Sequence, residues 1–304
     1  PPHNLFVGGW LGSQYVPYCL GGLPEQPDFT VGEKLDDPPA LADEELTPRS
    51  LQLPQEVPLA RFENRISLRQ ALDRATRRLE RFDSLQAAEG RYRDALRLLS
   101  TPAIRGAFDL ESEPASVRDT YGRTKIGGRC LMARRLIEAG ARFVMVDYGY
   151  DPDYGNVWDN HNVPEQKHPP IQKMVFRGYH LAGIDKAFAA LISDLQTRGL
   201  LDTTLVVFLT EFGRTPRINA NGGRDHWGKA GSLFFTGAGT RVGQVIGETD
   251  HHAAAPTSHG YTPADVAATL YHALGIDHHA TIKDLLDRPR PILDQGEPIR
   301  ELFS

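Results

Sequence analysis

Twice in the second half of the chain, a segment with helical periodicity leads into an apolar run of strand length. Apolar side chains recur at the spacing of one helix face over residues 126–139, and again over residues 172–198. The runs that follow, residues 142–148 and 204–210, are almost continuously apolar, as strands buried on both faces are. Because helices that alternate with buried strands form parallel sheets, this order predicts an α/β fold.

Further elements are expected on both sides of this alternation. The predicted architecture is a three-layer α/β/α domain with a mostly parallel sheet and additional N-terminal helices. Residues 1–120 are expected to form an irregular and helical segment packed on a core of residues 121–304, within one structural domain overall. The other expected elements are irregular structure over residues 1–58, helices within residues 61–99, a short helix from Pro102, a strand at residues 232–236, and a final helix over residues 262–274 that begins at Thr262-Pro263.

Composition excludes several classes of protein. The formal charge is −5, and Lys and Arg are spread along the sequence, so a nucleic-acid partner is not expected. No apolar run approaches the roughly 18 residues that a membrane span needs. Two cysteines, Cys19 and Cys130, are too few for a disulfide framework.

Two polar loops carry residues of the metal-ligand type. In the first, Asp159 and His161 lie two positions apart, and alternate residues of an extended chain point the same way, so both could bind one cation. In the second, Asp225 and His226 could be two ligands, or a ligand and the group that orients it. Both pairs also fit polar turns with a solvated imidazole, and their spacing leaves that alternative open.

A further acid, Glu211, directly follows the apolar run at residues 204–210. In open α/β sheets ligands collect at the carboxyl ends of the strands, so this position favours a metal ligand. A salt bridge to Arg214 or Arg217 would explain the same residue equally well. Arg214 and Lys229 could also neutralise an anionic oxygen, although a surface position is the default for both.

Among the remaining histidines, His259 is the best placed to be an additional ligand or an acid, since it lies in the loop before the final helix. Paired histidines at residues 251–252 and 278–279 are interpreted as solvated. The glycine-rich segment at residues 237–243 departs from the dinucleotide-binding spacing, so we predict a turn there.

Three motifs occur in an order that resembles one protein family. Together they are similar to the bacterial exported sulfatase-like family of unknown function, over residues 121–304. Residues 201–213 also resemble the strand of sulfatases and alkaline phosphatases that ends in a metal-binding acid, and residues 260–275 resemble their late helix. The three motifs are Trp158-Asp-Asn-His161, Thr210-Glu-Phe-Gly-Arg-Thr-Pro216 and Gly223-Arg-Asp-His-Trp227.

This resemblance implies an alkaline phosphatase-like core, a periplasmic or secreted location, and a divalent ion such as zinc, calcium, manganese or magnesium. It would place Asp159, His161 and His226 around one metal ion and Glu211 at another. Phe212 stands where that superfamily often has a histidine, which removes one ligand of the second metal.

The function expected from these residues is metal-dependent hydrolysis of a sulfate or phosphate ester of a small molecule or glycan. The metal would polarise the ester oxygen, with Asp225 and His259 as the catalytic groups. The superfamily's nucleophile comes from a segment that this sequence does not contain, and the start at Pro1-Pro2-His3 predicts a cleavage or truncation point. The alternative is an exported binding or structural protein without catalysis, which Phe212 favours.

Overall fold

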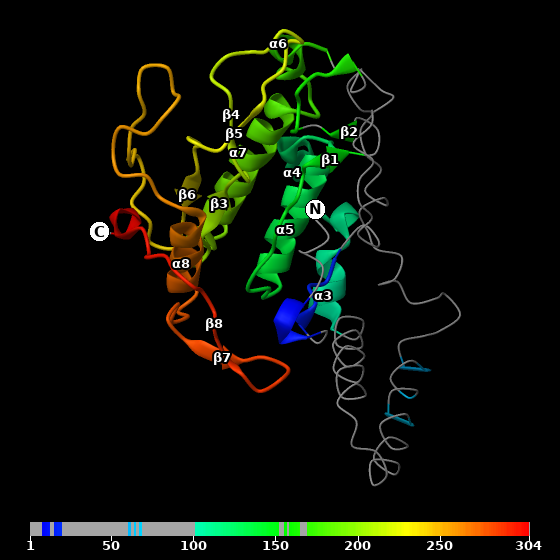
Figure 1. Ribbon diagram of the computed structural model, residues 1–304. Coiled ribbons are helices and arrows are strands. Elements are labelled where there is room, and N and C mark those ends of the chain that lie inside the picture. The colour runs from blue at the N-terminus through cyan, green and yellow to red at the C-terminus, as the bar shows by residue number, and fades with distance from the viewer. Residues whose placement is uncertain are drawn as a thin grey trace. The chain divides into compact units, whose positions relative to one another are not determined.

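A computed structural model of the chain describes residues 8–12, 15–19, 60–61, 64, 67–68, 101–151, 155–156, 158–164 and 169–303 (Figure 1). The described residues divide into two compact units, one that ends at Asp147 and one that begins at Tyr148. Among the described residues, none of the helices is long and apolar enough to cross a membrane.

Described residues of the first unit are mainly helical. Helix α5 begins after Thr124, whose side chain accepts a hydrogen bond from the Gly127 amide at 3.2 Å, and this cap satisfies one of the free donors of the first turn. Its buried side chains face α3 and α4, against which it packs. The elements are η2 (Gly9–Leu11), α3 (Pro102–Ala107), η6 (Leu110–Ser112), α4 (Ala115–Tyr121) and α5 (Lys125–Glu138).

A buried ion cluster ties α5 to the segment before α4. The Arg134 side chain is fully buried, and its guanidinium pairs with Glu113 at 2.8 Å and with Glu138 at 2.7 Å. The neighbouring Arg135 also donates to Glu113. Desolvation raises the pKa of Glu113, but the hydrogen bonds and charges of the two arginines outweigh it and hold that pKa below its ordinary value.

In the second unit, helices alternate with short strands. The described strands form four separate antiparallel pairs: β1 with β2, β3 with β6, β4 with β5, and β7 with β8. The elements are β1 (Tyr150–Asp151), β2 (Gly155–Asn156), α6 (Ile171–Met174), α7 (Leu181–Thr197), η8 (Leu201–Thr203), β3 (Val206–Phe208), β4 (Gly213–Arg214), β5 (His226–Trp227), β6 (Phe234–Thr236), α8 (Pro263–Ala273), β7 (Thr281–Lys283), β8 (Pro289–Pro291) and η9 (Arg300–Leu302).

Helix α7 packs against the β3–β6 pair, beside which it runs in Figure 1. The Phe188 ring meets the rings of Phe208 and Phe234 edge to face, with centroids 5.8 and 5.2 Å apart. Along the helix, Ala187 and Leu195 are almost completely buried. An apolar stripe at helical spacing therefore holds the pair in place.

At its start, α8 has a complete capping box. Thr262 accepts a hydrogen bond from the Asp265 amide, and the Asp265 carboxylate accepts one from the Thr262 amide at 2.7 Å. Further along, the buried Thr269 hydroxyl accepts a hydrogen bond from the Ile299 amide at 2.9 Å. These contacts join α8 to the C-terminal segment.

The expected parallel three-layer sheet is not present among the described residues, and that prediction was wrong in its architecture. A parallel pair needs a crossover of a dozen or more residues, usually a helix. Between β3 and β6 the chain instead folds back through the β4–β5 pair, so β6 returns antiparallel to β3, with Val207 opposite Phe235. What holds is a mixed content of helices and short strands.

Two of the expected elements also differ in extent. Residues 142–148 form no strand, and Phe143 and Met145 are 65% and 53% exposed. The helix expected over residues 172–198 is divided into α6 and α7. The segment between these helices packs closely on the first turn of α7, where a Cβ on Gly183 would lie 1.7 Å from the Gly178 carbonyl oxygen.

Elements that are indicated by short sequence signals were predicted correctly. The helix expected over residues 126–139 is α5, and the helix expected over residues 262–274 is α8. A turn occupies residues 237–240, where the Thr240 amide donates to the Gly237 carbonyl at 3.0 Å. The irregular segment expected at residues 1–58 and the helices expected within residues 61–99 lie almost entirely outside the described residues.

Candidate metal centre

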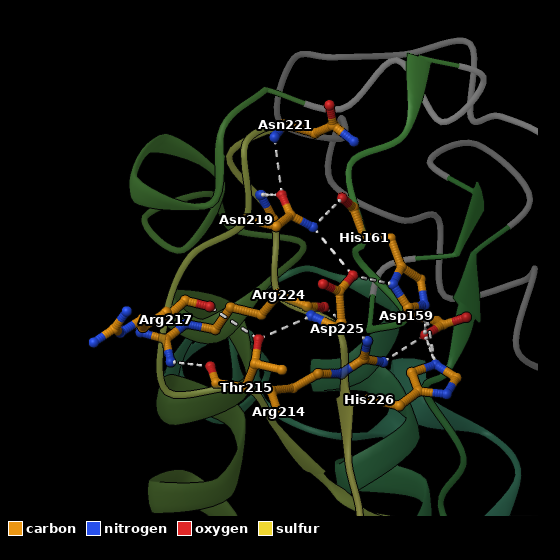
Figure 2. A network of polar contacts seen from close by, with 11 residues as sticks. Asp159, His161, Arg214, Thr215, Arg217, Asn219, Asn221, Arg224, Asp225 and His226 are labelled. Atoms are coloured by element: carbon orange, nitrogen blue, oxygen red, sulfur yellow. Dashed lines mark hydrogen bonds and ion pairs between the residues drawn. The ribbon is translucent and has the colours of Figure 1, made fainter. Parts of the chain in front are cut away.

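Three potential ligands converge in the second unit, two from the segment of residues 158–164 and one from strand β5 (Figure 2). The Nε2 atom of His226 lies 2.5 Å from Asp159 Oδ1, and the Nε2 atom of His161 lies 3.1 Å from the same oxygen. The two imidazole nitrogens are 3.1 Å apart. Two imidazole nitrogens and one carboxylate oxygen therefore face a single point.

The short β4–β5 pair brings one side of this cluster together. Its register sets Arg214 opposite His226, so that both side chains reach the same carboxylate. Arg214 Nη2 lies 2.7 Å from Asp159 Oδ1, and its Nη1 donates to the Arg224 carbonyl at 3.1 Å. At the end of β5, the Trp227 indole donates to the Ala254 carbonyl at 2.7 Å and anchors the strand.

Asp225 contacts the His161 ring at Nδ1, whereas the Nε2 atom of the ring faces Asp159. The Oδ1 atom of Asp225 lies 2.7 Å from His161 Nδ1. An ionised carboxylate can only accept hydrogen bonds, so Nδ1 carries the proton and the Nε2 of a neutral ring presents its lone pair to the cluster. A carboxylate behind a ligand histidine is the usual second partner at metal sites.

Asn219 joins the two loops at their backbones. Its Nδ2 donates to the His161 carbonyl at 3.0 Å and to Asp225 Oδ1 at 3.1 Å. Its Oδ1 accepts from the amides of Asn221 and Gly223, at 3.0 and 2.9 Å. One side chain therefore fixes the His161 segment and the turn that precedes Asp225.

Gly223 lies where the two loops approach most closely. A Cβ at this position would lie 2.4 Å from the His161 carbonyl carbon and 2.7 Å from the Asn160 carbonyl oxygen. Both neighbours are backbone atoms and cannot move aside alone. The absence of a side chain at Gly223 is therefore a condition for bringing His161 near His226.

Both acids are held in their ionised forms. Desolvation raises the pKa of Asp159, but hydrogen bonds from His226 and Arg214 and the Arg214 charge outweigh it and bring the pKa below its ordinary value. Hydrogen bonds from His161 and Asn219 lower the pKa of Asp225. Ionised carboxylates are the forms that bind cations or orient a histidine ligand.

The separations of the ligand atoms can be compared with a zinc site. With bonds of 2.0–2.1 Å in a tetrahedral arrangement, two ligand atoms lie about 3.3 Å apart. Two of the three separations are 3.1 Å and match this value, whereas the Asp159–His226 separation of 2.5 Å would have to open by about 0.8 Å. The His226 side chain is 48% exposed and has room for that movement.

Two residues predicted for the site lie outside this group of ligands. Glu211 is exposed, and the structure does not bring it to Asp159, His161 and His226. His259 is exposed as well, and its ring contacts Tyr261 with centroids 5.2 Å apart. The assumption that the acid after the β3 segment would lie at a common sheet edge depended on a parallel sheet, and the described residues form only antiparallel pairs.

A second group of possible ligands consists of His278, His279 and Glu297. The Nε2 atom of His278 lies 3.8 Å from Glu297 Oε2, and the Glu297 side chain is 68% exposed. The two histidine rings pack on each other with centroids 4.0 Å apart. Within the described part of the chain, no orienting carboxylate or arginine like those of the first group is found beside these residues.

Sequence reasoning missed several residues that build the candidate centre. Asn219, Asn221 and Gly223 belong to an Asn-Ala-Asn-Gly-Gly segment, which signals a turn but does not show what the turn contacts. Phe212 was noted as a departure from a ligand, and in the structure its ring packs on the His226 ring with centroids 4.1 Å apart.

Comparison with known proteins corrects the resemblance drawn from the motifs. A family model described as Protein of unknown function (DUF1501) matches residues 3–303. Neither the curated proteins nor the solved structures gave a match to this chain. This match does not indicate a sulfatase-like or alkaline phosphatase superfamily member, so that assignment was wrong. The periplasmic or secreted location was inferred from it and stays a prediction. Because the match spans almost the whole sequence, the chain belongs to the DUF1501 family.

Proposed function

We propose that Asp159, His161 and His226 bind a divalent metal ion, and that this centre hydrolyses an anionic ester. The observation that carries the metal site is the 3.1 Å approach of His161 Nε2 to Asp159 Oδ1. When the ring is neutral and its Nδ1 proton is directed to Asp225, this contact sets a lone pair against a carboxylate oxygen. A cation between the two atoms turns that repulsion into two bonds.

The ligand set favours zinc among the divalent ions considered. Imidazole nitrogens suit zinc, whereas calcium and magnesium take oxygen ligands almost exclusively. Two histidines and one carboxylate are also the protein ligands of several zinc hydrolases, in which a further position stays open. The exposed fractions of Asp159 and His226, 35% and 48%, leave such a position accessible.

Hydrolysis of an anionic ester is favoured by the charges next to the ligands. A bound divalent ion would supply a Lewis acid that polarises the ester oxygen and activates water. Arg214 would pair with a negatively charged oxygen of the substrate, and Asp225 would keep the His161 ring in place. Sulfate and phosphate esters are the substrate class that needs such positive charge.

An assay on chromogenic sulfate and phosphate esters tests this function. We expect turnover by the zinc-supplied protein and a loss of more than about a hundredfold in kcat/KM for Asp159→Ala, because a metal ligand and the partner of Arg214 are removed together. Asp185→Ala is the matched control, since Asp185 is exposed on α7. Equal turnover by wild type and Asp159→Ala would contradict the proposal.

A binding protein without catalysis is the second candidate, and the packing of Phe212 on His226 favours it. The ring covers one side of an imidazole that an enzyme would expose to its substrate. In that case the protein would retain its metal but would hydrolyse none of the esters. The same assay, run beside a measurement of metal content, separates the two functions.

A further inference from the structure

A pocket of about 420 Å³ lies beside the candidate metal centre within the second unit. Two of its lining residues connect it to that centre. Asn160 lies between two of the proposed ligands in the sequence, and Arg214 contacts Asp159 at 2.7 Å. The pocket and the metal centre therefore share a wall.

Half of the residues around this pocket have apolar side chains, and the others are Asn160, Gln172, His180, Arg214 and Arg224. Trp158, Ile171, Val175, Leu181 and Ile218 line it. Leu181 and Ile218 are 41% and 39% exposed, so part of this apolar surface is open to water. Covering such a surface with an apolar group is favourable, and pockets of this size and lining bind small organic molecules.

Two arginines give the same pocket a charged side. The Arg214 guanidinium is held by Asp159, and the Arg224 guanidinium donates to the carbonyls of Thr215 and Pro216 at 2.7 and 3.1 Å. Because protein acceptors fix their planes, these groups present positive charge at defined positions. An anionic group would therefore lie toward Arg214 and the metal centre.

A buried amide supplies one specific polar position. Asn160 is 3% exposed, and its Nδ2 donates to the Met174 sulfur at 2.9 Å. Its Oδ1 has no hydrogen-bond partner among the described residues. A buried acceptor without a partner is satisfied when a ligand brings a hydroxyl or N–H group to it.

We propose that this pocket binds the organic group of the ester and selects aromatic or branched aliphatic esters over sugar esters. This inference rests on the proposed function, because the metal centre and Arg214 would hold the anionic group. A sugar ring carries hydroxyl groups around its rim, and the apolar wall would leave most of them without partners. A phenyl ring loses no hydrogen bonds there, and Asn160 Oδ1 is the acceptor nearest to hand for a hydroxyl on that ring.

A comparison of the affinities of two organic anions tests the selectivity of the pocket. Calorimetry on the zinc-supplied protein would compare phenylphosphonate with glucose 6-phosphate. We expect phenylphosphonate to bind at least about tenfold more tightly, because only its ring fits the apolar wall. Equal affinities, or tighter binding of the sugar phosphate, would overturn the inference.

A substitution that fills the pocket provides a second test. Ile218→Trp adds a large ring at an exposed position of the wall, and we expect it to weaken phenylphosphonate binding about tenfold or more while binding of inorganic phosphate is unchanged. Val242→Trp is the control, since Val242 is 75% exposed and does not line the pocket. Unchanged phenylphosphonate affinity in Ile218→Trp would contradict the assignment.

Zinc content and inorganic phosphate affinity, measured on the same samples, separate failure of the pocket from failure of the metal centre. If zinc and phosphate bind but Ile218→Trp behaves as wild type, the pocket inference is wrong and the proposed function stands. If zinc is not bound and Ile218→Trp still loses phenylphosphonate affinity, the pocket inference stands and the proposed function is wrong.

Discussion

Two charged clusters of this protein contain similar residues but differ in their exposure to water. In the first unit, Glu113 is 8% exposed and pairs with the fully buried Arg134. In the second unit, Asp159 is 35% exposed, pairs with Arg214 and also receives two imidazoles. The first cluster is centred on a buried ion pair, whereas the second is partly exposed and contains three potential metal ligands.

This difference separates a structural ion pair from a candidate binding site. A buried pair with matched charges makes removal of one partner expensive, since the other charge stays buried. An exposed carboxylate costs less to lose, because water can solvate what remains. We therefore expect changes at Glu113 to affect stability, and changes around Asp159 to affect metal binding.

The largest effect is expected for Glu113→Gln. Removing this carboxylate leaves Arg134 and Arg135 without their shared partner, so the free energy of unfolding should fall by about 3–5 kcal/mol. Urea denaturation measures it, with Glu111→Gln as the control because Glu111 is exposed in the same turn. A loss no greater than that of the control would show that the two clusters do not differ as described.

Gly223→Ala is expected to damage the metal centre through the backbone. The added Cβ would meet the His161 carbonyl group, so the loops must separate, at a cost of about 1–3 kcal/mol. Zinc affinity should fall in the same variant. Gly228→Ala is the matched control, since its Cβ would meet nothing within 4 Å. Equal unfolding free energies and zinc affinities for the two variants would contradict the close approach at Gly223.

For Asp225→Asn we expect a selective loss of metal affinity. The amide would be a neutral partner for the His161 Nδ1–H group, without the negative charge of the carboxylate. Zinc should therefore bind about 10–100-fold more weakly. Stability should change by less than about 1 kcal/mol, because the Asp225 side chain is 51% exposed. Competition with a chelating dye measures the affinity, and an unchanged value would remove Asp225 from its orienting role.

A smaller effect is expected in the pH dependence of stability. The pKa of folded Glu113 lies below its unfolded value, so its contribution is complete above the unfolded pKa and is lost as the pH falls through the folded pKa. Wild type should therefore lose more unfolding free energy on acidification than Glu113→Gln, by about 1.4 kcal/mol for each unit of the pKa difference. Parallel pH profiles would show that Glu113 is not stabilised by the arginines.

Helices α5 and α8 could be predicted because their signals are local. Gly140, which has a φ of 96°, follows α5, and Thr262 caps α8 through its own side chain. An apolar run becomes a strand only when a partner lies beside it, and that information is not local. Residues 142–148 have the composition of a strand without forming one.

The same distinction applies to the candidate centre. Asp159 and His161 could be selected from their spacing in one loop, and His226 from its neighbouring acid. The approach of the two loops depends on the β4–β5 register and on the contacts of Asn219. No single segment contains that information. The sequence alone therefore could not show that Asn219 belongs to the site and that Glu211 does not.

Elemental analysis of protein purified without added metal or chelator tests the central claim most directly. We expect about one equivalent of a divalent metal, with zinc the first candidate, in wild type and a loss of that metal in His226→Ala. The second histidine group offers the control, because His279→Ala should retain the metal. Absence of metal from wild type, or full retention in His226→Ala, would contradict a metal centre at Asp159, His161 and His226.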